Sequence, residues 1–236
     1  PMCKVPDMSE YVFSPPAIQA IPIVGSDKLF PVNRIFCVGR NYEAHAKEMG
    51  VEIDREAPFY FTKSAASISM AEGSISYAKR TQNYHYEMEM VLAIGAAGLN
   101  VDIADAESLI FGCAAGLDMT RRDLQNDAKK LGRPWDTGKD VEQSAVITPI
   151  KPIAEVPSIA TARIHLAQNG EIKQESDLAL MVWSAAEIIA DLSSLYHLQP
   201  GDLIYTGTPA GVGPVERGDT LVGGVDGIAN FTVSFT

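Results

Sequence analysis

The sequence has few cysteines and no long apolar run, and each shortage excludes a class of protein. Its three cysteines, Cys3, Cys37 and Cys113, form an odd set with no CxxC spacing. This set disfavours a disulfide scaffold or a zinc site and suits reduced thiols in the cytoplasm. No run approaches the roughly 18 apolar residues of a membrane-spanning helix. The first 30 residues also lack the basic and apolar regions of a signal peptide. We therefore expect a cytoplasmic protein without membrane contact.

Positive charge is also scarce, because 19 lysines and arginines face 30 acidic residues, for a net charge of -11. Nucleic acids and anionic membranes require a basic surface, so neither is an expected partner. The nucleotide-binding patterns GxGxxG, opening a helix after a strand, and GxxxxGK[ST] are absent. A chain of 236 residues that is 46% hydrophobic and 21% charged is typical of a globular protein with one sizeable core.

The chain is expected to divide into a short arm and one large domain. Residues 1–32 are rich in proline with short apolar runs, which predicts an extended arm or an edge hairpin. Residues 33–236 would form the large domain. Met8 is a candidate natural start, which makes residues 1–7 a candidate addition to the native chain; the sequence leaves this open.

The pattern along the domain predicts many strands and few helices. Strands are expected at 34–39, 59–62, 83–95, 113–120, a hairpin over 161–176, and glycine-punctuated strands over 201–213 and 217–235. The hairpin turn is expected at Asn169-Gly170. Helices are expected at 41–50, 102–112, 121–132 and 183–196, with Asn41 and Asp102 as candidate N-caps. The fold class is therefore α+β, with a rolled, mainly antiparallel sheet.

Two acids open an otherwise apolar strand, "NYHYEMEMVLAIG", at residues 83–95. Glu87 and Glu89 are i and i+2, so they share one face, roughly 6–7 Å apart. For this pair alone, an exposed face paired with lysines is the favoured interpretation. Asp118, at the end of the predicted strand "CAAGLD", adds a third carboxylate. Three carboxylates favour a hard divalent cation such as Mg²⁺ or Mn²⁺.

A predicted helix follows Asp118 and carries groups suited to a substrate carboxylate. Arg122 and Gln125 share a face by i,i+3 spacing. Its other charged residues are interpreted as solvent-exposed: Arg121, Asp123, Asp127, Lys129 and Lys130. Lys139 follows in a predicted loop and by itself is typical of a surface lysine.

A second helix, "NYEAHAKEMG", offers a possible general base. His45 and Glu48 stand at i,i+3, so the carboxylate can orient the imidazole. A surface contact between them is the alternative interpretation.

Taken in order, six stretches resemble the fumarylacetoacetate hydrolase superfamily, over residues 33–236. They are "CVGRNYEAHAKEMG", "PFYFTK", "NYHYEMEMVLAIG", "GLDMTRRDLQ", "GRPWDTGKD" and "GDLIYTGTPAGVG". The resemblance implies a β-roll of mixed strands, a homodimer, and an active site that holds Mg²⁺, Mn²⁺ or Ca²⁺.

The resemblance also implies roles for individual residues. The metal ligands would be Glu87, Glu89 and Asp118. A catalytic dyad would be formed by His45 and Glu48, in a segment that acts as a lid in relatives. The substrate would be contacted by Arg122, Gln125 and Lys139, of which Lys139 would also be catalytic. The C-terminal loop would contribute Gly207 and Thr208. Relatives often have Lys-Pro where this chain has Lys63-Ser64, so no role for Lys63 follows.

Within the family, "FPVNRIFCVGRNYEAHAKEMG" and "NYHYE" are most similar to bacterial members that cleave fumarylpyruvate in gentisate-type aromatic degradation. The expected activity is metal-dependent hydrolysis of a carbon–carbon bond in an acylpyruvate, a small 2-oxo acid. The alternatives are an oxaloacetate decarboxylase, a keto–enol isomerase, or a non-catalytic relative that binds metal or ligand. The sequence leaves the acyl group and the physiological metal open.

Overall fold

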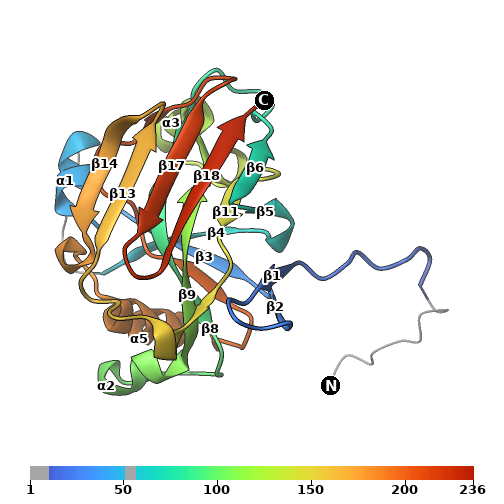
Figure 1. Ribbon diagram of the computed structural model, residues 1–236, viewed down its shortest axis with the longest axis vertical. Coiled ribbons are helices and arrows are strands. Elements are labelled where there is room, and N and C mark those ends of the chain that lie inside the picture. The colour runs from blue at the N-terminus through green and yellow to red at the C-terminus, as the bar shows by residue number, and fades with distance from the viewer. Residues whose placement is uncertain (1–10, 51–56) are drawn as a thin grey trace.

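The computed structural model describes residues 11–50 and 57–236. Its largest sheet has eight strands, in the order β4-β3-β15-β8-β9-β11-β5, with β12 paired to β9 (Figure 1). Its members are β3 (Ile35–Gly39), β4 (Phe59–Lys63), β5 (Ile68–Met70), β8 (Met88–Ile94), β9 (Ile110–Asp118), β11 (Ala145–Ile147), β12 (Lys151–Pro152) and β15 (Leu203–Tyr205).

A five-stranded sheet, ordered β14-β13-β17-β18-β6, lies in front of β8 and β9 in Figure 1. Its members are β6 (Glu72–Ile75), β13 (Arg163–Gln168), β14 (Glu171–Asp177), β17 (Thr220–Val225) and β18 (Ala229–Phe235). The predicted hairpin is β13–β14. Asn169 and Gly170 form its turn with φ values of 52° and 86°, the left-handed backbone that such turns require.

Two small sheets complete the fold. They are formed by β7 (Tyr84–Tyr86), β10 (Thr120–Arg121) and β16 (Gly213–Pro214), and by β1 (Ala20–Pro22) and β2 (Leu29–Pro31). The β1–β2 pair is the edge hairpin expected in the arm. The pairs β15–β3, β11–β5 and β18–β6 are parallel and the other paired strands are antiparallel. The mixed, mainly antiparallel fold class is therefore confirmed. The candidate addition at residues 1–7 lies outside the described residues.

The helices are short. They are α1 (Glu43–Glu48), α2 (Ile103–Ala106), α3 (Arg122–Lys130), α4 (Asp136–Lys139) and α5 (Ala185–Leu195). Helix α5 begins with the reciprocal hydrogen bonds of a capping box between Ser184 and Glu187. In the part of the chain that the structure describes, no helix has the length and apolar character needed to span a membrane.

The structure departs from the predicted helices in three details. The helix expected over 102–112 ends at Ala106, because the apolar run that follows begins the buried strand β9 at Ile110. Asp102 does hold the predicted N-cap position, but its side chain makes no capping hydrogen bond. Asn41 is not the N-cap of α1, a position that Tyr42 holds. The Asn41 amide instead donates to the carbonyls of Thr206 and Trp183 at 2.8 and 3.0 Å, which ties the start of α1 to the neighbouring loops.

Strand β8 is buried on both faces, which explains its unbroken apolar sequence. Met88, Met90, Leu92 and Ile94 pack into the core shared with the five-stranded sheet. Val91 and Ala93 face a second core that includes residues of the β1–β2 hairpin. By alternation, Glu89 lies on the face of Val91, at the end of this second core.

Candidate metal centre and active site

Three carboxylates meet where β8 and β9 run side by side. Glu87 directly precedes β8, Glu89 is its second residue, and Asp118 ends β9. The backbone N–H of Asp118 donates to the carbonyl of Glu87 at 2.9 Å, which fixes the two strand ends together. One oxygen from each carboxylate lies within 4.8 Å of the others. The three residues are only 5%, 2% and 0% exposed.

Gly116 makes this close arrangement possible. It pairs with Glu89 across the β8–β9 ladder. A Cβ atom at Gly116 would lie 2.6 Å from the carbonyl oxygen of Val146 and 2.9 Å from the Tyr205 ring. Any larger residue would therefore push the sheet apart directly beneath the acids.

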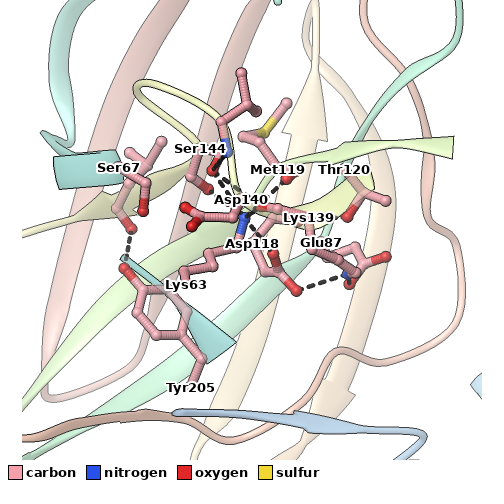
Figure 2. Close-up of polar contacts among 12 residues, drawn as sticks. Lys63, Ser67, Glu87, Asp118, Met119, Thr120, Lys139, Asp140, Ser144 and Tyr205 are labelled. Carbon is pink, nitrogen blue, oxygen red and sulfur yellow. Dashed lines mark hydrogen bonds and ion pairs between the residues drawn. The ribbon is translucent and has the colours of Figure 1, made fainter. Parts of the chain in front are cut away.

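Three buried cations face the three carboxylates. Arg122 and Lys139 donate to Glu87 at 2.5 and 2.8 Å. Lys139 also donates to Asp118 Oδ2 at 2.7 Å, and Lys63 Nζ lies 2.8 Å from Asp118 Oδ1 (Figure 2). The interpretation of an exposed acidic strand face is therefore wrong. Glu87 and Asp118 are paired with lysines, but inside the protein.

Lys63, for which no role was predicted, has a completely buried side chain. Its amine donates to the carbonyl of Met119 at 3.0 Å, to Ser144 Oγ at 2.9 Å and to the carbonyl of Lys139 (Figure 2). These bonds hold the backbone that carries Lys139 next to the end of β9. Lys63 thus links both sides of the acidic cluster.

The neighbouring charges shift the pKa values of the two glutamates in opposite directions. Burial acts to raise the pKa of Glu87, but the charges of Lys139 and Arg122 outweigh it and hold this pKa well below its usual range. Burial and the charges of Asp118 and Glu87 raise the pKa of Glu89 well above its usual value. Glu89 is therefore the acid whose charge is least compensated.

The cluster fits a hard divalent cation. Asp118 Oδ1 is buried and accepts no hydrogen bond from the described residues, although Lys63 lies close to it. Glu89 Oε2 accepts the N–H of Gly207 at 2.8 Å. A site made only of carboxylates, with lone pairs still available, suits Mg²⁺ or Mn²⁺ better than a softer metal.

A cavity opens above Glu87. Its lining includes His45, Arg122, Gln125 and Lys139. Arg122 Nη1 donates to Gln125 Oε1 at 2.6 Å, so the predicted pair does share one face of α3. Lys139 ends α4 and is 2% exposed, so its expected place in a surface loop is wrong.

The His45–Glu48 pair lies at one side of the cavity on α1. His45 Nδ1 is 3.4 Å from Glu48 Oε2, and Glu48 in turn accepts the N–H of Gly211 at 3.1 Å. His45 is 7% exposed. Burial lowers the pKa of His45, and the charge of Glu87 and the bond to Glu48 only partly offset this. The imidazole is therefore neutral at pH 7 and able to accept a proton.

The loop after β15 contributes Gly207 and Thr208. Gly207 has a φ of 99°, and a Cβ there would lie 2.7 Å from the Cβ of Asn41. Only glycine therefore lets this backbone approach Glu89. Thr208 lines the cavity, and its hydroxyl accepts from Gln174 at 2.8 Å. Gln174, from β14, was not predicted as a site residue.

Sequence reasoning also missed cavity residues. Arg40, Lys129 and Trp135 line the cavity. Lys129, expected to be solvent-exposed, is half-buried and points into the site. Helical periodicity could have indicated the place of Lys129, because positions 122, 125 and 129 lie on one helix face. Of the other four charged residues, Asp127 and Lys130 are exposed as expected, whereas Arg121 and Asp123 are half-buried.

Comparison with known proteins agrees with this geometry. A family model described as fumarylacetoacetate hydrolase, C-terminal, matches residues 34–235. A fumarylpyruvate hydrolase from a Ralstonia species is 52% identical over 188 residues, which cover 79% of this chain and 97% of that protein. A mitochondrial oxaloacetate tautomerase from Mus musculus is 36% identical over 196 residues, covering 83% of this chain and 88% of that protein.

A solved structure gives the same likeness in three dimensions. The fumarylpyruvate hydrolase from Pseudomonas aeruginosa, in complex with Mn²⁺ and pyruvate, superposes with a TM-score of 0.93 at 45% identity. The match covers 96% of this chain and 99% of that chain.

Proposed function

The chain belongs to the fumarylacetoacetate hydrolase family, and from this membership we propose that it hydrolyses a carbon–carbon bond in an acylpyruvate. The proposed substrate is fumarylpyruvate, and the products are fumarate and pyruvate. The 52% identical relative is named fumarylpyruvate hydrolase. The structural relative that contains Mn²⁺ also contains pyruvate, one of the two proposed products. The proposed role is a step in the breakdown of aromatic compounds.

One observation carries the proposal. Three buried carboxylates, a neutral histidine with its own carboxylate, and an arginine–amide pair converge on a single cavity. Isolated buried charges are unfavourable, so a cluster of this density is typical of a reaction centre.

The proposed metal ligands are Glu87, Glu89 and Asp118. A divalent cation held there would act as a Lewis acid that stabilises negative charge on the pyruvate half of the substrate. Arg122 and Gln125 would bind a substrate carboxylate, because the guanidinium presents paired donors and the amide holds it in place. Gly207 and Thr208 would close the opposite wall of the site.

His45 is the proposed general base. It takes a proton from a water molecule, whose oxygen attacks the carbonyl carbon of the acyl group. The bond between this carbon and C3 of the pyruvate half then breaks, and its electron pair forms the pyruvate enolate. Lys139 stabilises the enolate charge, and protonation at C3 yields pyruvate. Glu48 keeps the His45 imidazole oriented throughout.

Oxaloacetate tautomerisation or decarboxylation is the second candidate, since relatives with these names are 36% and 35% identical. Both reactions use an enolate without an attacking water. The lower identity of these relatives supports this second candidate less well than hydrolysis.

A homodimer in a reducing cytoplasm is also proposed. In the arm, Val12 and Phe13 are 97% and 77% exposed, which supports a second copy as their cover. Cys37 and Cys113 are buried free thiols, which suits a reducing compartment. A mass measurement in solution by light scattering tests the dimer.

The decisive assay supplies fumarylpyruvate or oxaloacetate with Mg²⁺ or Mn²⁺. We expect rapid loss of the conjugated enol absorbance of fumarylpyruvate, with fumarate and pyruvate formed in equal amounts and little CO₂ from oxaloacetate. Fast CO₂ release or enol–keto conversion of oxaloacetate, with fumarylpyruvate left intact, would support the second candidate instead.

A further inference from the structure

Two cations in the active-site cavity have no carboxylate partner. Arg40 and Lys129 line the same cavity as Arg122 and Lys139. The latter two are paired with Glu87 at 2.5 and 2.8 Å. Within residues 11–50 and 57–236, no carboxylate oxygen lies within 4.0 Å, the limit for an ion pair, of a side-chain nitrogen of Arg40 or Lys129. Their charges are therefore not used to hold the acidic cluster.

Both cations rest on one aromatic surface. Lys129 Nζ lies 4.8 Å from the centre of the Trp135 ring, and Arg40 Cζ lies 5.8 Å from that of Phe59. Trp135 contacts Phe59 and Phe61, with ring centres 4.9 and 5.9 Å apart. Cation–π contacts of this kind orient a positive charge without neutralising it.

The position of Lys129 is electrostatically unfavourable in the absence of an anion. Burial and the positive charges of Arg122 and Arg40 lower the pKa of Lys129 to about 8. Among the described residues lining the cavity, Glu87 is the one carboxylate, and it already accepts from two cations. An anion that entered between Arg40 and Lys129 would relieve this repulsion.

We propose that Arg40 and Lys129 form the subsite for the far carboxylate of a dicarboxylic acylpyruvate, an inference that rests on the proposed function. Fumarylpyruvate has one carboxylate beside its keto group and a second at the end of the acyl chain. The carboxylate beside the keto group is bound near Arg122 and the acidic cluster. The second is bound by Arg40 and Lys129, while Phe61 and Trp135 pack against the flat conjugated chain between them.

The spacing on α3 suits a ligand with charges at both ends. Lys129 follows Arg122 by seven residues, which places the two on the same helix face. At 1.5 Å per residue, they are about 10 Å apart along the helix axis. A seven-carbon dicarboxylate can extend across two helical turns, whereas the four carbons of oxaloacetate cannot reach both cations. The subsite would therefore select long dicarboxylic substrates against oxaloacetate.

The test compares two substrates that differ only at the far end. Crotonylpyruvate has the same unsaturated acyl chain as fumarylpyruvate, with a methyl group in place of the far carboxylate. The variants are Lys129→Met, which keeps the packing on Trp135, Lys129→Arg, which keeps the charge, and Arg40→Gln. Lys130→Met is the matched control, because Lys130 is the next residue of α3 and is exposed.

For fumarylpyruvate, Lys129→Met and Arg40→Gln should raise KM roughly 10- to 100-fold with kcat changed less than about threefold, as expected for one lost charged hydrogen bond. Neither variant should impair kcat/KM for crotonylpyruvate. Lys129→Arg should restore most of the fumarylpyruvate affinity, and Lys130→Met should behave as the unchanged protein.

Two results would overturn the inference while leaving the proposed function intact. One is an unchanged KM for fumarylpyruvate in Lys129→Met. The other is an equal loss on both substrates, which would indicate a structural role. If the unchanged protein hydrolyses neither acylpyruvate with Mg²⁺ or Mn²⁺ present, the proposed function itself fails.

Discussion

Lys63 Nζ lies 2.8 Å from Asp118 Oδ1, and neither side chain is exposed to solvent. The lysine comes from β4 and the aspartate from β9, so the contact joins distant parts of the largest sheet. Its N–H groups are directed at backbone carbonyls and Ser144. Lys63 therefore balances the charge of Asp118 while leaving Oδ1 without a hydrogen bond.

Replacing Lys63 should destabilise the whole fold. In Lys63→Met, Asp118 loses part of its charge compensation, and four buried acceptor atoms lose the lysine as a donor. We expect a loss of about 3–5 kcal/mol in the free energy of unfolding, measured by urea denaturation without metal. The control, Lys173→Met, removes an exposed pair with Glu171 and should change stability by less than about 1 kcal/mol. Equal stability of the two variants would refute this role of Lys63.

Glu89→Gln should increase the stability of the metal-free protein and decrease the stability of the protein with metal present. The change removes one of three clustered negative charges but keeps an oxygen to accept the N–H of Gly207. In the unchanged protein, Mn²⁺ at about 100 times its Kd should stabilise the fold by about 2.7 kcal/mol. Thermal unfolding with and without MnCl₂ measures both effects. Full metal stabilisation in Glu89→Gln would exclude Glu89 as a ligand.

The pH dependence should follow His45. Its pKa lies below the usual 6.5, mainly because the ring is buried, so the neutral base persists into mildly acidic solution. Activity should therefore hold from neutral pH downward and be lost as pH falls through the lowered pKa. A profile of kcat/KM against pH measures this acidic limb.

His45→Gln should reduce kcat by roughly 10²- to 10⁴-fold while keeping metal binding. Full turnover by that variant would eliminate His45 as the base.

Glu48→Gln should shift that acidic limb to still lower pH. The Glu48 carboxylate raises the pKa of His45 through its hydrogen bond and charge, so its removal lowers this pKa further. We also expect a lower kcat, because the bonds from His45 and the Gly211 N–H to the Glu48 carboxylate orient the ring. A limb that moves to higher pH would contradict the arrangement.

Strand alternation places Glu87 and Glu89 on one face, but it does not separate a buried cluster from an exposed one. The prediction of the acidic cluster also needed Asp118 at the end of a second apolar strand. The sequence was insufficient for Lys63 and Lys139. Their burial depends on tertiary contacts between segments 76 residues apart, as in the bond from the Lys63 amine to the Lys139 carbonyl. No local pattern distinguishes these lysines from exposed ones.

Two other errors have different physical causes. The helix over 102–112 was extended too far because a short apolar run fits a buried strand as well as a helix. The charge of Lys129 favours exposure to solvent, whereas its helical spacing from Arg122 and Gln125 places it on the face that lines the cavity.

Attack by water on the acyl carbonyl is tested most directly by whether water oxygen enters the product of carbon–carbon cleavage. Fumarylpyruvate is converted by the Mn²⁺-loaded protein in H₂¹⁸O over a short incubation, and exchange of the ketone oxygen is measured without enzyme over the same time. We expect one ¹⁸O in each fumarate beyond that exchange, because one oxygen of the carboxylate formed at cleavage comes from water. Fumarate without this label would contradict attack by water activated at His45.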